Sequence, residues 1–475
     1  MKRLNPRPFA AVCIAAAWLL AACGGSDAAN PAVSAPPSSG SIFNASPQAL
    51  PSAYYEKEFI LTGSASRYRI PADRSNGQLV DEGHPYVTRA IVRAPADPAR
   101  FNGTVVVEWL NVTTGQDIDF VYGAARDLLL REGYAYVGVS AQRVGVEALR
   151  KWNPARYGSL SVAASNTDPQ NGALLDPPAG PVAVGGDVLA WDVFSQVGAA
   201  VRTRQSPLLP GYDVQRVIAA GESQSASRLV MYHNAIQPLH NIYQGFLLYD
   251  RGGTVRTDTS VKLLAVGTEF TSTTSGAPQP DDAHRRWWEI AGASHVSLGE
   301  MDYLDPMVQR DGVLRAPNGQ ALSLTGAVAA GNCQVTPIWS RVPNAAVVMG
   351  ALSALNSWIK TGTEPAKVDR LVMDSAGKLA RDSSGRVAGG LRTAAYDAPM
   401  SRNTGVNGGG GFCILSGSHV DFTPAELCSR YGSAANYQAQ VRSIAVNNVA
   451  QRHLLQEEAN RIITQAADVQ FNCAP

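Results

Sequence analysis

Short apolar runs alternate with helical stretches along the first half of the chain. Runs rich in β-branched and aromatic residues predict strands, and residues 120–132, between two of these runs, have the spacing of a helix. The runs beyond residue 100 are apolar throughout, which is typical of parallel strands buried on both faces. This alternation predicts an α/β architecture. The strands predicted in this part of the chain are residues 54–69, 86–94, 103–112 and 134–142.

The alternation continues as far as residue 292. A helix is predicted at 187–202, and the apolar run that begins at Val217 predicts a strand followed by a helix at 225–235. Each strand ends in a polar or small residue, and ligands bind at the carboxyl ends of strands in open α/β sheets. We therefore look for functional residues at these strand ends. The later elements are strands at 242–250, 261–269 and 286–292, and a helix at 344–360 that closes the core.

Two stretches break the pattern. Residues 143–186 are rich in Pro, Gly, Asn and Ser, and an irregular segment of this length, with its aromatic residues, predicts a lid or pocket wall. Beyond residue 362, two Asp-Ser-x-Gly turn signals, a Gly-rich loop at 408–411 and a long helical stretch at 436–467 predict a C-terminal extension. The Gly-rich loop lacks the Lys and the strand of a phosphate loop, so it indicates flexibility. The predicted domains are an α/β core at 52–362, with 143–186 as an insertion, and an extension at 363–475 packed on that core.

The N-terminus has the pattern of an export signal. Three basic residues among the first seven precede an apolar run at 9–20, which is too short to span a bilayer. The ending Leu-Ala-Ala-Cys resembles a bacterial lipobox, which implies a signal peptide at 1–22 and lipidation of Cys23. An ordinary signal peptide with an incidental cysteine is the alternative. Residues 23–51 then predict a flexible linker, and we expect a lipoprotein of the periplasm or outer membrane, in contact with the membrane only through its anchor.

Composition and charge exclude several classes of partner. The chain has 40 Lys and Arg residues against 39 Asp and Glu residues, and no basic patch indicates nucleic-acid binding. Its 475 residues, 45% of them hydrophobic, can bury a large core. No Cys-x-x-Cys pair or Cys/His cluster predicts a metal site, and no cofactor is expected.

Four cysteines follow the signal segment: Cys333, Cys413, Cys428 and Cys473. An even number in an exported protein predicts two disulfides, for which three pairings exist. Cys413–Cys428 is the first choice because these two residues are close in sequence. That choice leaves Cys333–Cys473, which would hold the C-terminus to the core.

Gly221-Glu222-Ser223-Gln224-Ser225 has the pattern of a nucleophile elbow. In this motif a strand, a sharp turn and a helix present a serine at the apex, where strained backbone requires small neighbours. Gly221 meets that need, whereas Ser225 stands where a second glycine is usual. A Ser-rich helix cap after a strand would explain the same residues without chemistry.

A serine nucleophile needs a base, and an acid that orients the base. In this architecture the acid and then the histidine follow the serine along the chain. His295 follows the last predicted core strand and is the predicted base. Glu269, at the end of the strand before it, is the first choice of acid. Asp250 is the main rival, followed by Asp281 and Asp282.

The oxyanion of such a reaction needs backbone N–H donors. The N–H of Gln224, directly after the serine, is one candidate, and Asn111 or Val112, in the loop after the 103–112 strand, is the second. Four further residues could line the pocket or serve only the structure: Trp109, Gln142, Tyr157 and Glu222.

Several of these motifs together make the chain similar to a bacterial family of secreted or predicted proteins described as "alpha/beta hydrolase domain". The similarity runs over nearly all of the chain beyond the signal and implies an α/β-hydrolase fold with a lid-like insertion and a hydrolase activity, without naming a substrate. It supports Ser223 and His295, and the elbow of this family often reads Gly-Glu-Ser-Gln-Ser. The motifs are Val-Glu-Trp-Leu-Asn-Val (107–112), Val-Ser-Ala-Gln (139–142), Arg-Tyr-Gly-Ser-Leu (156–160), Gly-Glu-Ser-Gln-Ser (221–225), Trp-Glu-Ile-Ala-Gly-Ala-Ser-His (288–295) and Gly-Gly-Leu-Arg (389–392).

These observations predict a serine hydrolase that acts on small-molecule esters. Ser223, His295 and Glu269 would form its triad, and no cofactor or metal takes part. Two alternatives remain open at this point: a hydrolase-fold binding protein that has lost turnover, and an acyltransferase or peptidase that uses the same triad.

Overall fold

A nine-stranded, mostly parallel sheet forms the centre of the molecule in the computed structural model, which describes residues 30–178, 185–203, 205–250, 253–275 and 279–473. The strand order is β1-β2-β3-β5-β4-β6-β7-β8-β9. The six strands from β5 to β9 in this order are parallel, and β1 to β3 form an antiparallel edge. The strands are β1 Ala32–Ser34, β2 Tyr54–Arg69, β3 Gln78–Pro95, β4 Thr104–Trp109, β5 Ala135–Val139, β6 Arg216–Glu222, β7 Gly245–Tyr249, β8 Lys262–Gly267 and β9 Arg285–Glu289.

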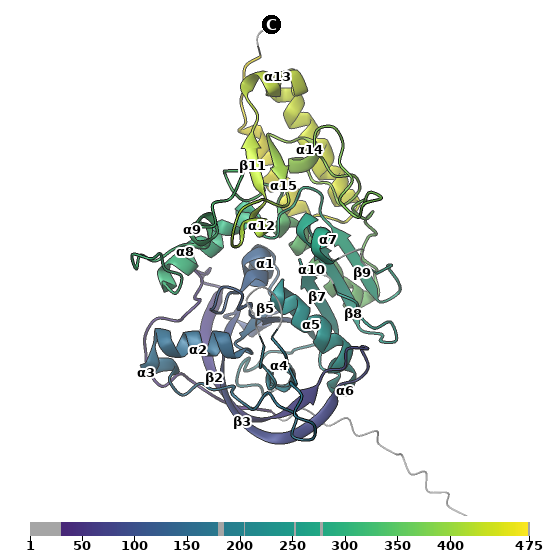
Figure 1. The fold of residues 1–475 in the computed structure, drawn as a ribbon. Helices are drawn as coiled ribbons and strands as arrows, with labels where there is room; N and C mark the ends of the chain where they lie inside the picture. The colour runs from purple at the N-terminus through teal and green to yellow at the C-terminus, as the bar shows by residue number, and fades with distance from the viewer. Residues whose placement is uncertain (1–29, 179–184, 204, 251–252, 276–278, 474–475) are drawn as a thin grey trace, which may run out of the picture.

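Helices cover both faces of the sheet because the central strands are apolar throughout. Successive residues of a strand point to opposite faces. Val105 and Val107 of β4 therefore pack with α4 and α5, whereas Val106 packs on the other side with α1 and α10. Figure 1 shows these helices around the sheet. The core helices are α1 Phe120–Arg131, α2 Arg143–Trp152, α3 Pro154–Tyr157, α4 Ala190–Arg202, α5 Gln224–Ala235, α6 Gln237–His240, α7 Glu269–Ser275, α8 Met301–Asp311, α9 Leu324–Ala329 and α10 Asn344–Thr361.

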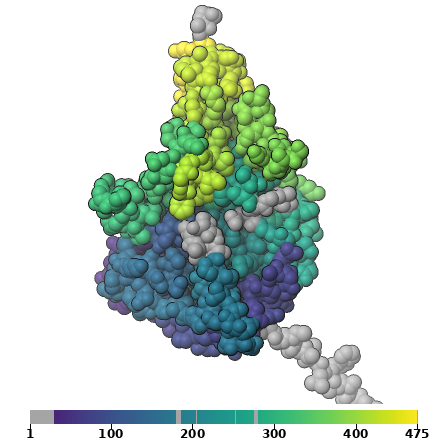
Figure 2. Space-filling view, in the orientation of Figure 1, coloured from purple at the N-terminus to yellow at the C-terminus, as the bar shows by residue number. Residues whose placement is uncertain are grey.

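The C-terminal extension projects from the core at the carboxyl ends of the parallel strands (Figures 1 and 2). It has its own small apolar cluster, which includes Leu427, Tyr437 and Val441. The long helix predicted at 436–467 is two helices, separated by a turn at Arg452, whose φ is 61°. The elements of the extension are α11 Ala394–Asp397, β10 Ser401–Thr404, α12 Cys413–Ser416, β11 Ser418–Asp421, α13 Pro424–Tyr431, α14 Ala434–Ala450 and α15 Gln456–Ala467.

The segment predicted as a flexible linker is packed on the core wherever the structure describes it. Residues 32–34 pair with β2, and Phe43 is only 1% exposed. Arg93 donates a 2.9 Å hydrogen bond to the carbonyl of Asn44, and the Asn44 N–H donates to Asp311 at 2.8 Å. The Ser- and Pro-rich composition concealed these anchors because few of the residues are large and apolar. The predicted signal peptide and Cys23 lie outside the described residues.

The two disulfides join Cys333 to Cys413 and Cys428 to Cys473, so the predicted pairing is wrong. Nearness in sequence misled the prediction, because Cys413 begins α12, beside the segment that follows α9, while Cys428 lies in α13 beside the C-terminal tail.

The Gly-rich loop at 408–411 lies against the Cys333–Cys413 bridge and is hydrogen-bonded rather than free: Gly410 N donates to Gly331 O at 2.8 Å. A Cβ on Gly409 would lie 2.8 Å from the sulfur of Cys413, so this close approach requires glycine.

None of the helices in the described ranges is long and apolar enough to cross a membrane.

Candidate active site

Ser223 stands at the sharp turn between β6 and α5 with φ 54° and ψ −116°, a backbone conformation that non-glycine residues rarely adopt. The turn is tight because the helix begins at the next residue. A Cβ on Gly221 would lie 3.0 Å from the carbonyl carbon of Ser225, so a larger residue there would press on the backbone of the first turn of α5. Ser225 stands where a second glycine is usual, and its hydroxyl points back to the backbone of Glu222. The hydroxyl donates to the Glu222 carbonyl at 2.8 Å and accepts from the Glu222 N–H at 3.0 Å.

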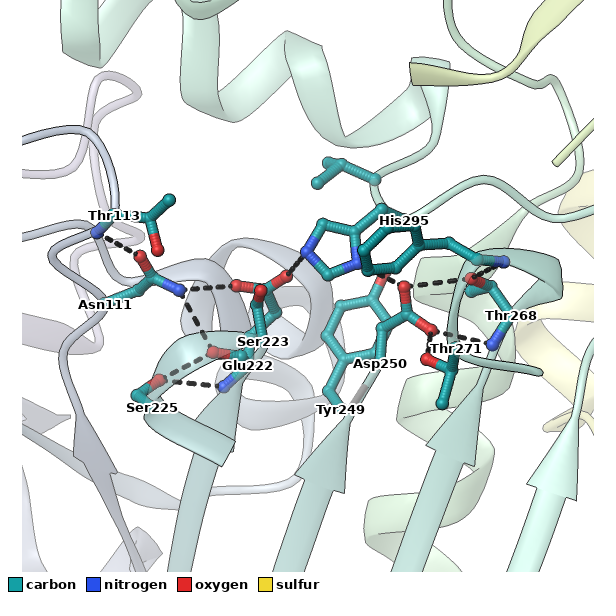
Figure 3. A network of polar contacts seen from close by, with 12 residues as sticks. Asn111, Thr113, Glu222, Ser223, Ser225, Tyr249, Asp250, Thr268, Thr271 and His295 are labelled. Carbon is teal, nitrogen blue, oxygen red and sulfur yellow. Dashed lines mark hydrogen bonds and ion pairs between the residues drawn. The ribbon is translucent and has the colours of Figure 1, made fainter. Parts of the chain in front are cut away.

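His295 lies in the loop after β9 and contacts Asp250 through its Nδ1 atom (Figure 3). Asp250 follows β7 directly, with φ 44°, and both of its carboxylate oxygens are held in place. The N–H and the hydroxyl of Thr268 donate to it at 2.7 and 2.9 Å, and the hydroxyl of Thr271 also donates. The ring of Phe270 packs edge-on against the imidazole at 4.7 Å. His295 is 2% exposed and Asp250 is fully buried.

Glu269 is not placed to orient the histidine. It begins α7, and its carboxylate accepts a 2.8 Å hydrogen bond from Gly292 N and pairs with Arg381 at 2.5 Å. The sequence-based choice failed because the residue at the end of β8 that reaches toward the site is Thr268, which holds Asp250. Asp281 and Asp282 are also remote, since they precede the amino end of β9, whereas His295 follows its carboxyl end.

Glu222 lies on the other side of the imidazole. Its Oε1 atom is 2.9 Å from Nε2 of His295, and its Oε2 atom accepts a 2.9 Å hydrogen bond from Asn111 Nδ2. The sequence suggested Glu222 only as a pocket residue. Its position directly before an elbow serine was the one signal that could have indicated this contact. The other three pocket candidates lie in the core, where Trp109 donates to Gln142 at 3.0 Å and Tyr157 donates to Glu58 at 2.7 Å.

Two carboxylates therefore flank one buried imidazole. Burial would by itself lower the pKa of His295, but the negative charges of Glu222 and Asp250 outweigh it and raise that pKa to about 10. Burial also raises the pKa of Glu222, and the neighbouring His295 opposes that effect. The histidine thus favours its doubly protonated form in this arrangement.

The predicted oxyanion donors have different surroundings. Gln224 is the first residue of α5, where N–H groups have no partner within the helix. The N–H of Asn111 donates to Ile118 O at 3.0 Å, so it is not free for an oxyanion, and the prediction for Asn111 is wrong in this respect. The buried hydroxyls of Thr113 and Thr114 have no hydrogen-bond partner in the described part of the chain, and both residues line the cavity beside Ser223.

The cavity beside Ser223 and His295 has a volume of about 40 Å³. We call its apolar wall the cover: Leu324 and Val328 of α9, then Trp339, Phe412 and Leu415. Within the described ranges, no lining residue belongs to 143–186, and the apolar wall comes instead from α9, Trp339 and the C-terminal extension. The remaining lining residues are Asn111, Thr113, Thr114, Phe120, Glu222, Ser223, His295 and Val296.

The described parts of the insertion, residues 143–178 and 185–186, contribute to the core and do not line the cavity. It contains α2 and α3, which the sequence did not predict, and it buries Tyr157 and Leu160. Asp176 pairs with Arg228 of α5 at 2.6 Å. No group of three or more His, Cys, Asp or Glu side chains suited to a metal ion occurs among the described residues.

The model of a family described as alpha/beta hydrolase domain matches residues 28–464. No curated protein matches the chain significantly. Solved structures with a similar fold include acetyl xylan esterase 1 from Thermoanaerobacterium, at 11% identity and a TM-score of 0.26, with 46% of this chain and 53% of that chain covered. A serine hydrolase without a lid from Xanthomonas campestris has 14% identity, a TM-score of 0.26, and coverage of 49% and 85%.

A putative acetyl xylan esterase from Bacteroides fragilis has 11% identity and a TM-score of 0.26, with 45% and 59% covered. The chain spans about half the length of the first of these solved proteins. These similarities concern the fold alone.

Proposed function

Because the chain belongs to the alpha/beta hydrolase domain family, we propose that it is a serine hydrolase of carboxylic esters, in which Ser223 is the nucleophile, His295 the base and Asp250 the orienting acid. The observation that carries this proposal is the contact between His295 and Asp250 beside a serine in strained elbow geometry. The order serine, acid, histidine along the chain is the order typical of this fold.

Each group has a role in acyl transfer. His295 Nε2 takes the hydroxyl proton of Ser223 as the oxygen attacks the acyl carbon, and Asp250 holds Nδ1 so that Nε2 is the reacting nitrogen. The N–H of Gln224 and a hydroxyl of Thr113 or Thr114 donate to the oxyanion. The imidazolium then protonates the departing alcohol, and water attacks the acyl-enzyme in a second round with the same groups.

The cavity supports a small acyl group. Its volume of about 40 Å³ holds about three water-sized groups, and its cover is apolar. An acetyl or propionyl group fills such a space, whereas a long acyl chain does not fit within it. We therefore propose esters of short acyl groups as substrates.

The compartment is a proposal drawn from the N-terminal sequence. A signal peptide followed by a lipidated Cys23 would hold the protein on the periplasmic side of a bacterial membrane. Two disulfides in a chain of this size accord with an oxidising compartment. Metabolic labelling with a fatty acid analogue tests the anchor, and Cys23→Ala should remove the label.

Fluorophosphonate labelling tests the nucleophile. We expect the wild-type protein to be labelled and Ser223→Ala to stay unlabelled, with circular dichroism as a check that both are folded. A panel of acetyl, butyryl and octanoyl esters of one alcohol then measures the hydrolase activity. A folded wild type that neither reacts with the probe nor cleaves any ester would contradict the proposal and favour a binding protein.

A further inference from the structure

The carboxylate of Glu222 occupies the reacting side of His295. The Nε2 atom must take the serine proton in the proposed mechanism, yet it lies 2.9 Å from Oε1 of Glu222 (Figure 3). At this distance the carboxylate and the ring form a buried ion pair when His295 is protonated. Glu222 is 1% exposed and lines the reaction cavity. A buried carboxylate is costly unless a partner compensates its charge, and the imidazole of His295 is placed to do so here.

Asn111 holds this carboxylate in place. Its side-chain amide donates to Oε2 of Glu222 at 2.9 Å and to the Glu222 carbonyl at 3.1 Å. The amide itself is fixed, because its oxygen accepts from Thr113 N at 2.8 Å and its backbone pairs with Ile118. The loop after β4 therefore positions Glu222, and the end of β6 carries it.

The charged groups around the imidazole are mostly acidic. Asp250, at the end of β7, contacts Nδ1, and Glu222, at the end of β6, contacts Nε2. Glu300 lies in a short helical turn at 298–300, and burial, with a smaller contribution from the charge of Glu222, raises its pKa to about 7. Glu269 of α7 is paired with Arg381. The ring of Phe270 packs against the imidazole, and the carbonyl of Leu415 accepts a hydrogen bond from the N–H of His295.

We propose that Glu222 is a positioning residue that holds His295 as an imidazolium in the resting site and stabilises that imidazolium during the reaction. This inference rests on the proposed function, because it assigns Glu222 a role relative to the catalytic base. The base becomes available when water takes the Nε2 proton at high pH, and the neutral Nε2 then accepts the hydroxyl proton of Ser223. Once His295 has taken the serine proton, the two carboxylates share its positive charge.

The test is the pH dependence of kcat/KM for the full chain with an acetyl ester. The negative charge of Glu222 raises the pKa of His295, so its removal in Glu222→Gln lowers that pKa and makes the neutral base available at lower pH. A charge at this distance shifts a pKa by about one to three units. We expect the acid limb of Glu222→Gln to move to lower pH by about this amount, and the plateau at high pH to fall because the imidazolium loses a partner.

Glu269→Gln is the matched control, because it also replaces a buried carboxylate near the site but one that the structure places away from the ring. Its acid limb should stay with that of the wild type. Asn111→Ala removes the anchor and keeps the charge, so its limb should move in the same direction by less. An unchanged acid limb in a folded Glu222→Gln protein would overturn the proposal, since a merely structural role lowers the plateau alone.

A second readout does not depend on activity. The imidazole ¹⁵N shifts of the free Ser223→Ala protein report the protonation of His295 directly. We expect both ring nitrogens to be protonated at pH 8, and the pH at which Nε2 loses its proton to fall when Glu222→Gln is added. A neutral His295 at pH 8 in the parent protein would contradict the inference. If the ¹⁵N shifts are as expected but the protein hydrolyses no ester, the role of Glu222 stands and only the proposed function is contradicted.

Discussion

The reaction cavity has two sides that are built in different ways. We call the polar side, made by Asn111, Glu222, Ser223, Asp250 and His295, the floor. Its residues lie at or just beyond the ends of β4, β6, β7 and β9, which belong to one hydrogen-bonded sheet. The cover is apolar and comes from α9, Trp339 and the residues around α12. The disulfide between Cys333 and Cys413 joins the two segments of the chain that supply the cover.

The floor therefore determines the chemistry of the reaction, and the cover determines which substrates fit. On the floor, function depends on the placement of charges, since a displacement of either carboxylate changes the protonation of His295. The cover contributes size, shape and exclusion of water, which strengthens the electrostatic interactions below it. The one backbone link between the two sides in the described structure near the histidine runs from His295 N to Leu415 O, at 3.1 Å. Substitutions on the two sides should therefore have different signatures.

The largest effect is expected on the floor, from Asp250→Asn. An amide cannot stabilise the imidazolium and can favour the wrong tautomer of the histidine, so kcat should fall by about 10⁴-fold while the protein stays folded. Glu269→Gln is the matched variant and should retain most of the activity. Steady-state hydrolysis of an acetyl ester measures both. The opposite ranking of the two variants would return the role of the acid to Glu269.

Removal of one disulfide or the other should distinguish the cover from the rest of the extension. The double variants Cys333→Ser/Cys413→Ser and Cys428→Ser/Cys473→Ser each lose a bridge that closes a long loop, with sequence separations of 80 and 45 residues. Each should lower the free energy of unfolding by about 2–4 kcal/mol. Only the first should also lower kcat/KM, because only that bridge borders the cover. Thermal unfolding and ester hydrolysis, measured below both transitions, provide the comparison. Equal losses of activity in the two variants would mean that the cover does not depend on its bridge.

A change in the cover should alter the choice of acyl group with little effect on the chemistry. Val328→Ala removes two methyl groups from the cavity wall, and we expect the ratio of kcat/KM for butyryl over acetyl esters to rise about tenfold, as for a change of a methylene or two in an apolar pocket. Val347→Ala, in α10 and outside the lining, is the control for loss of packing. If both variants keep the preference of the wild type, the acyl group does not occupy this cavity.

Substrates that differ in the alcohol group complete that comparison. For the wild type, the rates for acetyl esters of a small and a bulky alcohol should differ little. The rates for the acetyl and octanoyl esters of one alcohol should differ more. A steeper dependence on the alcohol would assign the cavity to the leaving group.

Local patterns were sufficient for much of the fold. The parallel strands, the helix after Ser223 and the positions of Ser223 and His295 at strand ends follow from apolar runs and from one short motif, both of which are properties of neighbouring residues. The antiparallel pair β2 and β3 was also predicted from its alternation and β-branched content, whereas β1 lies in the segment predicted to be a flexible linker. The helices α2 and α3 were missed because turn-forming residues dominate that segment.

Contacts between distant parts of the chain were not predictable in this way. Asp250 and Glu269 both follow a core strand and are both acidic, and only the positive φ of Asp250 and the hydrogen bonds from Thr268 place one of them at the histidine. The predicted disulfide pairing was wrong for the same reason, because separation in sequence says little about which segments of the fold lie side by side. The packing of residues 30–51 depends on partners more than a hundred residues away, such as Tyr157 and Asp311.

The sequence by itself determined the α/β architecture, the elbow with its serine and the histidine that follows the last core strand, because these features are recorded in runs of adjacent residues. Only the tertiary structure decided which acid meets His295, that Glu222 lies on its other nitrogen, and that α9 and the C-terminal extension form the cover. Those outcomes depend on distances of a few ångströms between residues tens to hundreds of positions apart, which arise only when the strands are ordered in the sheet and the extension is packed over their ends.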